Sequence, residues 1–133
     1  MRLTRASSYA LHALVFMAAQ KQNRPTPSHL IAQARGIPER FLLKVLKPLV
    51  AARVLVSIKG PNGGYRLARS PSSVTLLEVI EAADGPVRGH SPLSQQDPDS
   101  QLNQKLEAVC EQAADRIRRQ LERVRLSDLV GKK

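Results

Sequence analysis

The residues best suited to chemistry lie in one short stretch, residues 38–48, with the sequence PERFLLKVLKP. Side chains at positions i, i+3, i+4 and i+7 of an α-helix form a single ridge, and here they are Arg40, Leu43, Lys44 and Lys47. Cations around one apolar side chain fit the phosphates and base edges of a DNA major groove. We therefore predict a recognition helix that begins at Pro38, turns Phe41 inward with Leu42, Val45, Leu46 and Leu49, and bends at Pro48, which has no backbone N–H donor.

A glycine-rich hairpin follows that helix. The segment KGPNGG, residues 59–64, separates a β-branched run, residues 54–58, from a second short run, residues 65–68. Glycine and asparagine tolerate a positive φ and let a phosphate approach closely, which applies to Gly60, Asn62, Gly63 and Gly64. Lys59 and Arg66 are expected to flank the tip. This pattern predicts a basic wing that reaches the minor groove, and an ordinary surface hairpin with glycines for geometry alone is the alternative.

Two helices are needed to position that ridge. In residues 26–36, Thr26 is expected to cap a helix with Pro27 at its first position, Leu30, Ile31 and Ala34 facing inward, and Gly36 in the left-handed C-terminal position. The few residues around Gly36 and Ile37 then form the short turn of a helix-turn-helix. Ahead of it, Thr4 is expected to cap a mostly buried helix that the polar run of residues 20–24 ends.

The charge is distributed unevenly along the 133 residues. Residues 1–69 hold twelve Lys or Arg and one acid, Glu39, whereas residues 70–133 hold nine Lys or Arg against ten acids. This asymmetry marks the first half as a nucleic-acid surface; a solubilising surface and an anionic membrane are the alternatives. No apolar run approaches the ~20 residues of a membrane span, and no signal peptide is evident. We expect a cytoplasmic protein without membrane association.

The second half of the chain predicts a helix, a loop and a longer helix. Thr75 and Glu78 form a capping box, and Gly85-Pro86 ends that helix. Residues 88–101 are polar and rich in proline, which predicts a mobile loop with His90 in solvent. Apolar residues then recur at nearly heptad spacing and predict a dimerisation seam: Leu102, Leu106, Val109, Ala113, Ile117, Leu121 and Val124. Packing of this helix on its own domain is the alternative.

These elements predict a mainly α fold with one small β-hairpin. We expect a winged helix-turn-helix domain over residues 1–86, a flexible loop over 87–101, a dimerisation helix over 102–126 and a tail over 127–133. A twofold dimer would present two recognition helices to a palindromic site. The function predicted from these elements is therefore a homodimeric DNA-binding regulator, with double-stranded DNA as its partner.

Catalysis is not indicated. The three histidines lie in different predicted elements, no GxSxG, HExxH or P-loop pattern is present, and Glu78, Glu81 and Asp84 fit an exposed helix face. A winged-helix module that docks RNA or a partner protein is the alternative function. Two Phe and two Tyr offer few stacking platforms for single strands.

Several stretches together resemble the IscR-like, Rrf-type family of bacterial winged-helix transcription regulators. The resemblance covers nearly the whole chain except residues 89–101 and is carried by MRLTRASSYALHALVFMA, IPERFLLKVLKPLV, KGPNGGYRLAR, TLLEVIEAADGPV and LERVRLSDLV. It implies homodimers on palindromic promoter DNA, usually repressing, often under control of an iron–sulfur cluster. The candidate DNA contacts are Ser28, Pro38, Glu39, Arg40, Phe41, Lys44, Lys47, Lys59, Asn62, Gly63, Gly64 and Arg66. Leu43 stands where the iron–sulfur regulator has an acid, so base preference does not carry over.

Cluster-bearing members place three cysteines in the loop before the long helix and at its start. This chain has none between residues 88 and 108, and its single thiol, Cys110, falls about six residues beyond the last of those positions, so we expect no iron–sulfur cluster, no metal and no other cofactor. Three routes of control stay open: oxidation of Cys110 as a redox thiol, a small-molecule effector near residues 88–101, or a partner protein. A packing role for Cys110 is the alternative.

Overall fold

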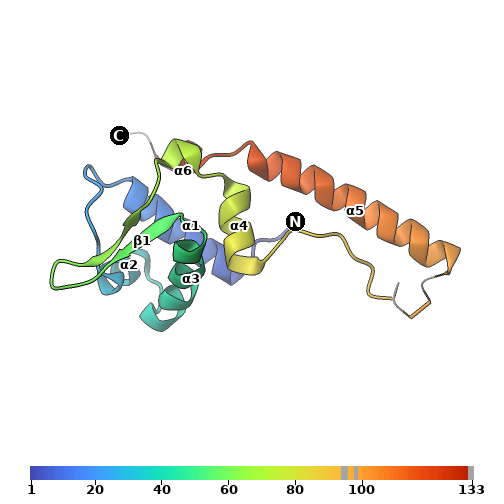
Figure 1. Cartoon of the computed structure of the whole chain (residues 1–133), viewed down its shortest axis with the longest axis horizontal. Helices are drawn as coiled ribbons and strands as arrows, with labels where there is room; N and C mark the ends of the chain where they lie inside the picture. Colours follow the sequence, from blue (N-terminus) through green and yellow to red (C-terminus); the bar gives the residue numbers. More distant parts are fainter. Residues whose placement is uncertain (94–95, 98, 132–133) are drawn as a thin grey trace.

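The computed structural model describes residues 1–93, 96–97 and 99–131. A body of short helices and one hairpin carries a long helical arm, α5, that extends away from it (Figure 1). None of the helices in the described part of the chain is long and apolar enough to span a bilayer. The elements, in chain order, are α1 (Arg5–Ala18), α2 (Ser28–Arg35), α3 (Glu39–Ala51), β1 (Leu55–Ile58), β2 (Gly64–Leu67), the short 3₁₀ helix η1 (Pro71–Ser73), α4 (Leu76–Asp84), α5 (Gln101–Glu122) and α6 (Leu126–Leu129).

The helix-turn-helix begins and ends as its capping residues dictate. The Thr4 side chain accepts a hydrogen bond of 3.0 Å from Ser7 N at the start of α1. Gly36 closes α2 with φ of 64°, in the left-handed region. Only residues 36–38 separate α2 from α3, and Pro38 is the N-cap of α3, not its first helical residue. The predicted short turn is confirmed.

The buried faces of α2 and α3 differ from the expectation at three positions. Ile31 is fully buried, but Leu30 is 46% exposed and Ala34 is also exposed, because Ala32 takes the second inward position of this eight-residue helix. Phe41 is 39% exposed. It was expected to point inward, yet the inward stripe of α3 is already complete without it: Leu42, Val45, Leu46 and Leu49.

The wing is a two-stranded antiparallel hairpin that is tied to the loop before α2. In the register Leu55 faces Leu67 and Ile58 faces Gly64. Thr26 and Tyr65 exchange backbone hydrogen bonds of 2.9 Å in both directions. The prediction that Thr26 is the N-cap of α2 is therefore wrong, because the Thr26 backbone pairs with β2. Pro27 occupies the cap position.

A strained residue joins α3 to the wing. Arg53 has φ of 62°, a left-handed conformation that glycine adopts at lower cost. The following residue, Val54, donates its N–H to Leu49 O at 3.0 Å and closes the end of the helix. This turn directs the chain from α3 into β1 immediately, so that the wing starts beside α3.

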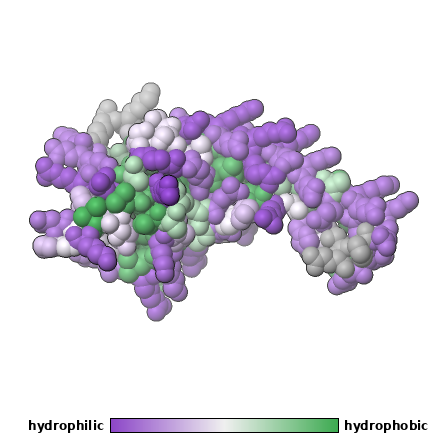
Figure 2. Space-filling model, viewed as in Figure 1, coloured by the Kyte–Doolittle hydropathy of each residue, from purple (hydrophilic) through white to green (hydrophobic). Residues whose placement is uncertain are grey.

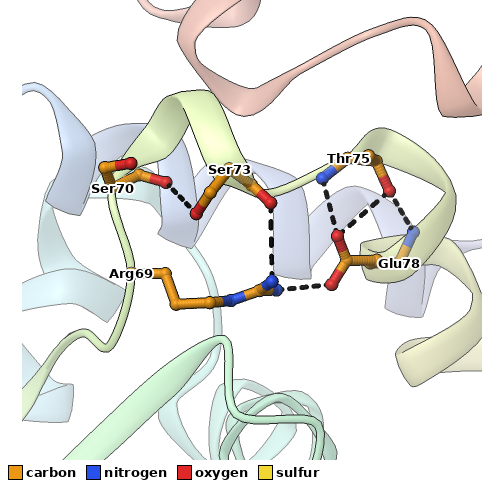
Figure 3. A network of polar contacts seen from close by, with 5 residues as sticks. All are labelled: Arg69, Ser70, Ser73, Thr75 and Glu78. Atoms are coloured by element: carbon orange, nitrogen blue, oxygen red, sulfur yellow. Dashed lines mark hydrogen bonds and ion pairs between the residues drawn. The ribbon is translucent and has the colours of Figure 1, made fainter.

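The predicted capping box of α4 is present and joins a larger polar network (Figure 3). Thr75 Oγ1 accepts from Glu78 N at 3.0 Å, and Glu78 Oε1 accepts from Thr75 N at 3.2 Å. Glu78 also forms an ion pair with Arg69. Partial burial alone would raise the pKa of Glu78, but the hydrogen bond from Arg69, the Thr75 N–H and the Arg69 charge outweigh it, so this pKa lies below its ordinary value of 4.5.

A second acid of α4 also has a structural partner. Asp84 accepts hydrogen bonds from Thr4 Oγ1 at 2.6 Å and from Ser7 Oγ at 2.5 Å. These contacts place a carboxylate at the positive N-terminal end of α1. Glu81 accepts from Val87 N at 2.9 Å. The acids of α4 thus fasten the helical body together, and do not simply form the exposed face that was expected.

The arm α5 has one face on its own chain and one face in solvent. Near its C-terminal end Leu121 packs with Leu77 and Ile80 of α4, and hydrophobic residues on the visible face of the arm gather toward this junction (Figure 2). The segment of residues 87–91 lies along the arm, since a Cβ added to Gly89 would come within 1.8 Å of the Cys110 carbonyl oxygen. Leu126 of α6 is buried in the main core.

The segment expected to be a mobile loop makes specific contacts in its first half. Ser91 N donates to Glu107 Oε2 at 2.9 Å, and His90, which is half exposed, lies 3.2 Å from Glu107 Oε1. Arg118 donates to Val87 O. Part of the remaining stretch, residues 94–95 and 98, lies outside the described residues.

Candidate nucleic-acid interface

The candidate interface begins with the exposed face of α3, which we define as Arg40, Phe41, Leu43, Lys44 and Lys47. All five side chains are exposed. The Arg40 guanidinium carbon lies 4.9 Å from the centre of the Phe41 ring, and Lys44 Nζ lies 5.6 Å from it. An aromatic face attracts cations at these distances. Phe41 therefore holds two cations on the solvent side of α3, an arrangement that its predicted inward orientation would not allow.

Other predicted contacts surround this face. Pro38 and Glu39 are exposed at the start of α3, whereas Ser28, at the start of α2, is half-buried. The N-terminal part of α1 approaches from the other side: Arg5 and Tyr9 line with Phe41 and Lys44 an apolar groove of about 220 Å³. The sequence pattern did not bring α1 to this surface, because its apolar spacing indicated only a buried helix.

The wing supplies the next group of predicted residues. Lys59 and Asn62 are exposed at the tip. A Cβ at Gly63 would lie 2.1 Å from Ile58 O, and a Cβ at Gly64, where φ is 143°, would lie 2.3 Å from the Thr26 carbonyl. Both glycines are thus required by the packing of the backbone within the wing and against the loop before α2.

Arg66 does not lie at the tip of the wing. It sits inside β2 opposite Val56, it is half-buried, and its Nη1 atom is 3.4 Å from Leu67 O. A residue that the sequence analysis did not single out, Asn23, holds this strand by its side chain: Nδ2 donates to Leu67 O at 2.9 Å and Oδ1 accepts from Leu67 N at 3.1 Å. No local pattern signals this contact, since the two residues are 44 positions apart.

Comparison with known proteins identifies the class of this fold. The chain matches the family model described as Rrf2, iron-dependent transcriptional regulator, over residues 3–132. The chain belongs to the Rrf2 family. The predicted family and the mainly helical winged-helix fold are thus confirmed. The family model and the relatives are described as transcriptional regulators and not as enzymes, and this chain belongs among them.

Individual Rrf2 relatives match over different shares of their length. The Rv1287 protein of Mycobacterium tuberculosis is 30% identical over 132 residues, which cover 98% of this chain and 82% of that protein. Protein aau3 of Rhizobium meliloti is 38% identical over 84 residues, 63% of this chain and 54% of its own. The HTH-type transcriptional regulator IscR of Vibrio campbellii is 34% identical over 84 residues, 63% of this chain. The matched region spans about half the length of aau3 and of IscR.

Solved structures show the same Rrf2 architecture. CymR (YrzC), the global cysteine regulator of B. subtilis, superposes with a TM-score of 0.77 at 26% identity over 97% of this chain and 95% of that one. The T. potens IscR superposes with a TM-score of 0.72 over 97% of this chain and 85% of that one; at 22% identity this likeness concerns the fold alone.

The Rrf2 description implies iron, but the residues of this chain do not fit an iron–sulfur cluster. Such clusters are held mainly by several cysteine thiolates, and the chain has the single half-buried Cys110. In the described residues no three His, Cys, Asp or Glu side chains converge in a way that could hold a metal ion. His90 and Glu107, whose nitrogen and oxygen lie 3.2 Å apart, supply two potential ligands between them. We derive no role for iron in this chain.

Proposed function

We propose that this chain is a homodimeric repressor that binds palindromic promoter DNA, with α3 in the major groove and the wing tip at the minor groove. The observation that carries the proposal is the exposed α3 face, on which Phe41 gathers Arg40 and Lys44. Restricting two long cations before binding lowers the entropy cost of fixing them on DNA. Glu39 is the single acid in residues 1–69, so repulsion of phosphates is small there.

The proposed dimer is supported by the solvent face of α5. Leu102, Leu106 and Val109 are 65%, 42% and 60% exposed. These residues continue a stripe of apolar side chains that the body covers toward its C-terminal end, at Ile117 and Leu121. A helix rarely leaves such a stripe in water, and a second copy of the same helix would cover it.

The test begins with selection of bound sites from random-sequence duplex DNA. Arg40→Ala and Lys44→Ala should each lose roughly 1–3 kcal/mol of binding free energy at the selected site, and each variant should be less selective for that sequence. Lys59→Ala should weaken binding to every duplex and make the dependence of log K on log salt less steep by about one unit. Fluorescence anisotropy over a salt series measures both quantities. Arg119→Ala, which removes an exposed cation of α5 away from the apolar stripe, is the matched control and should change neither.

Two outcomes would contradict the proposed groove assignment. Equal losses on random and selected DNA for Arg40→Ala, Lys44→Ala and Lys59→Ala would mean that α3 does not read bases. Binding to single-stranded RNA as tight as binding to duplex DNA would favour the RNA-docking alternative.

A further inference from the structure

The wing tip lies against a second segment of the chain, the loop of residues 19–27 that joins α1 to α2. Two independent contacts fasten this loop along β2: the reciprocal backbone pair of Thr26 and Tyr65, and the two side-chain hydrogen bonds from Asn23 to Leu67. Gly64 leaves no room between the wing and Thr26 for even one added carbon. The loop and the wing therefore present one continuous surface.

Arg24 lies between those two anchors and close to the tip. It lines, with Pro25, Pro27, Pro61, Asn62 and Gly63, a groove of about 410 Å³ between the loop and the wing. Three of these residues are prolines, whose fixed φ keeps the walls of the groove in place. A cation on a rigid wall loses less entropy when it binds an anion than a cation on a free loop does.

The Arg24 side chain is available for a ligand. It is exposed, and across residues 1–93, 96–97 and 99–131 no carboxylate forms an ion pair with it. Two basic residues in and just after β2 differ: Arg69 is paired with Glu78, and Arg66 is half-buried against Leu67 O. Arg24 thus occupies the place beside the tip that the sequence pattern assigned to Arg66.

We propose that Arg24 binds a backbone phosphate of duplex DNA beside the wing, so that two cations from separate segments, Arg24 and Lys59, hold the DNA where the wing meets it. This inference rests on the proposed DNA-binding mode. The groove carries a positive charge, it opens next to the glycine tip, and its other walls are proline, asparagine and glycine. A guanidinium in such a setting recognises phosphate by paired N–H donors.

Salt-dependent binding of the full-length chain tests the assignment. Each phosphate contact contributes about −0.9 to the slope of log K against log salt. Arg24→Ala should therefore make this slope less steep by about one unit. It should also weaken binding roughly five- to tenfold at 0.1 M salt, equally on random and selected duplex. Arg24→Lys should restore most of the affinity. Lys21→Ala removes a cation of the same loop that does not line the groove, and it should leave the slope unchanged.

A neutral-phosphate scan locates the contact. Methylphosphonates, which replace a charged phosphate by a neutral group, are placed one at a time along the selected duplex. They should weaken DNA binding by the wild-type chain at one or two positions beside the wing. At those positions they should not weaken binding by Arg24→Ala any further. Additive losses at every position would overturn the proposal, as would an unchanged slope in Arg24→Ala. Faster amide exchange at Tyr65 in Arg24→Ala would also overturn it, because the effect would then come from a loosened wing. Failure of the wild-type chain to bind any duplex would instead refute the proposed function itself.

Discussion

At the scale of single residues, packing decides which side chains of the candidate interface face solvent and which of its positions require glycine. Phe41 faces solvent because four neighbours already fill the inward stripe of α3. Gly64 is required because the Thr26 backbone lies directly against it. The sequence predicts glycines in the wing. Only the packing shows which of them are required because another backbone segment lies against them, and which are required only by the conformation of the turn.

This difference predicts unequal effects of alanine at two wing glycines. Gly64→Ala combines φ of 143° with a Cβ 2.3 Å from the Thr26 carbonyl, whereas Gly60→Ala combines φ of 106° with open space. Gly64→Ala should therefore lower the free energy of unfolding by at least about 2 kcal/mol, and Gly60→Ala by about 1 kcal/mol. Urea unfolding measures both. Equal losses would mean that the contact between Thr26 and the wing is absent in solution.

At the scale of elements, helix starts and stops follow local chemistry, and the first turn of α4 is the clearest case. Its capping box was predictable from Thr75 and Glu78 alone, but the ion pair with Arg69 was not, because it depends on how the chain returns from the wing. The backbone of Arg53 was not predictable either. Its residue type does not indicate φ of 62°, which results from the tight turn between α3 and β1.

The Arg69–Glu78 pair predicts a specific acid sensitivity. Since the pKa of Glu78 is lowered in the folded chain, its ionised form stabilises the fold above about pH 4.5, and this contribution is lost as the pH falls through the lowered pKa. The two side chains are 35% and 38% exposed, so solvent screening limits the effect to about 0.5–1 kcal/mol.

Glu78→Gln keeps an oxygen for the capping box and removes the charge. We expect its free energy of unfolding to fall below that of the wild type at pH 7 and to converge with it as the pH falls through the lowered pKa of Glu78. Glu122→Gln, at an exposed position on α5, is the control and should follow the wild-type pH profile. Parallel profiles for the wild type and Glu78→Gln would contradict the lowered pKa.

At the scale of the whole molecule, the arm decides how two copies could meet. The seven apolar positions predicted for the seam do not form one surface. Leu121 is 7% exposed and packs on α4, and Val124 lies beyond the end of α5, where its carbonyl accepts from Leu76 N at 2.8 Å. A test of the dimer must therefore use the solvent-facing residues.

Leu106→Asp combined with Val109→Asp should give a monomer by sedimentation equilibrium and strongly reduce binding to a palindromic site. Charged groups on the exposed stripe would have to be buried in the dimer, at a cost of several kcal/mol. Ala108→Asp, an exposed substitution on another face of α5, should keep the dimer. If the double variant kept the molecular mass of the wild-type dimer, the proposal that α5 is the dimerisation helix would be wrong.

Most of the architecture was predictable from the sequence, and the reason is local. Caps, glycine stops and apolar spacing at Thr4, Gly36 and Thr75 act within a few residues of the chain. The role of Asn23 and the packing of Gly89 on Cys110 were not predictable, because each joins residues far apart in the sequence. The candidate interface falls between these cases: its cations were identified, but their arrangement around Phe41 was not.

The exposed position of Leu43 has a practical consequence for changing what the regulator recognises. This side chain is 40% exposed on α3, and the buried stripe of the helix does not include it. Exchanges at this position therefore change the proposed readout surface and should alter the free energy of unfolding little. The helix can serve as a scaffold for retargeting, in which a library at one codon is screened for new operators while the proposed DNA contacts of the loop and wing stay unchanged.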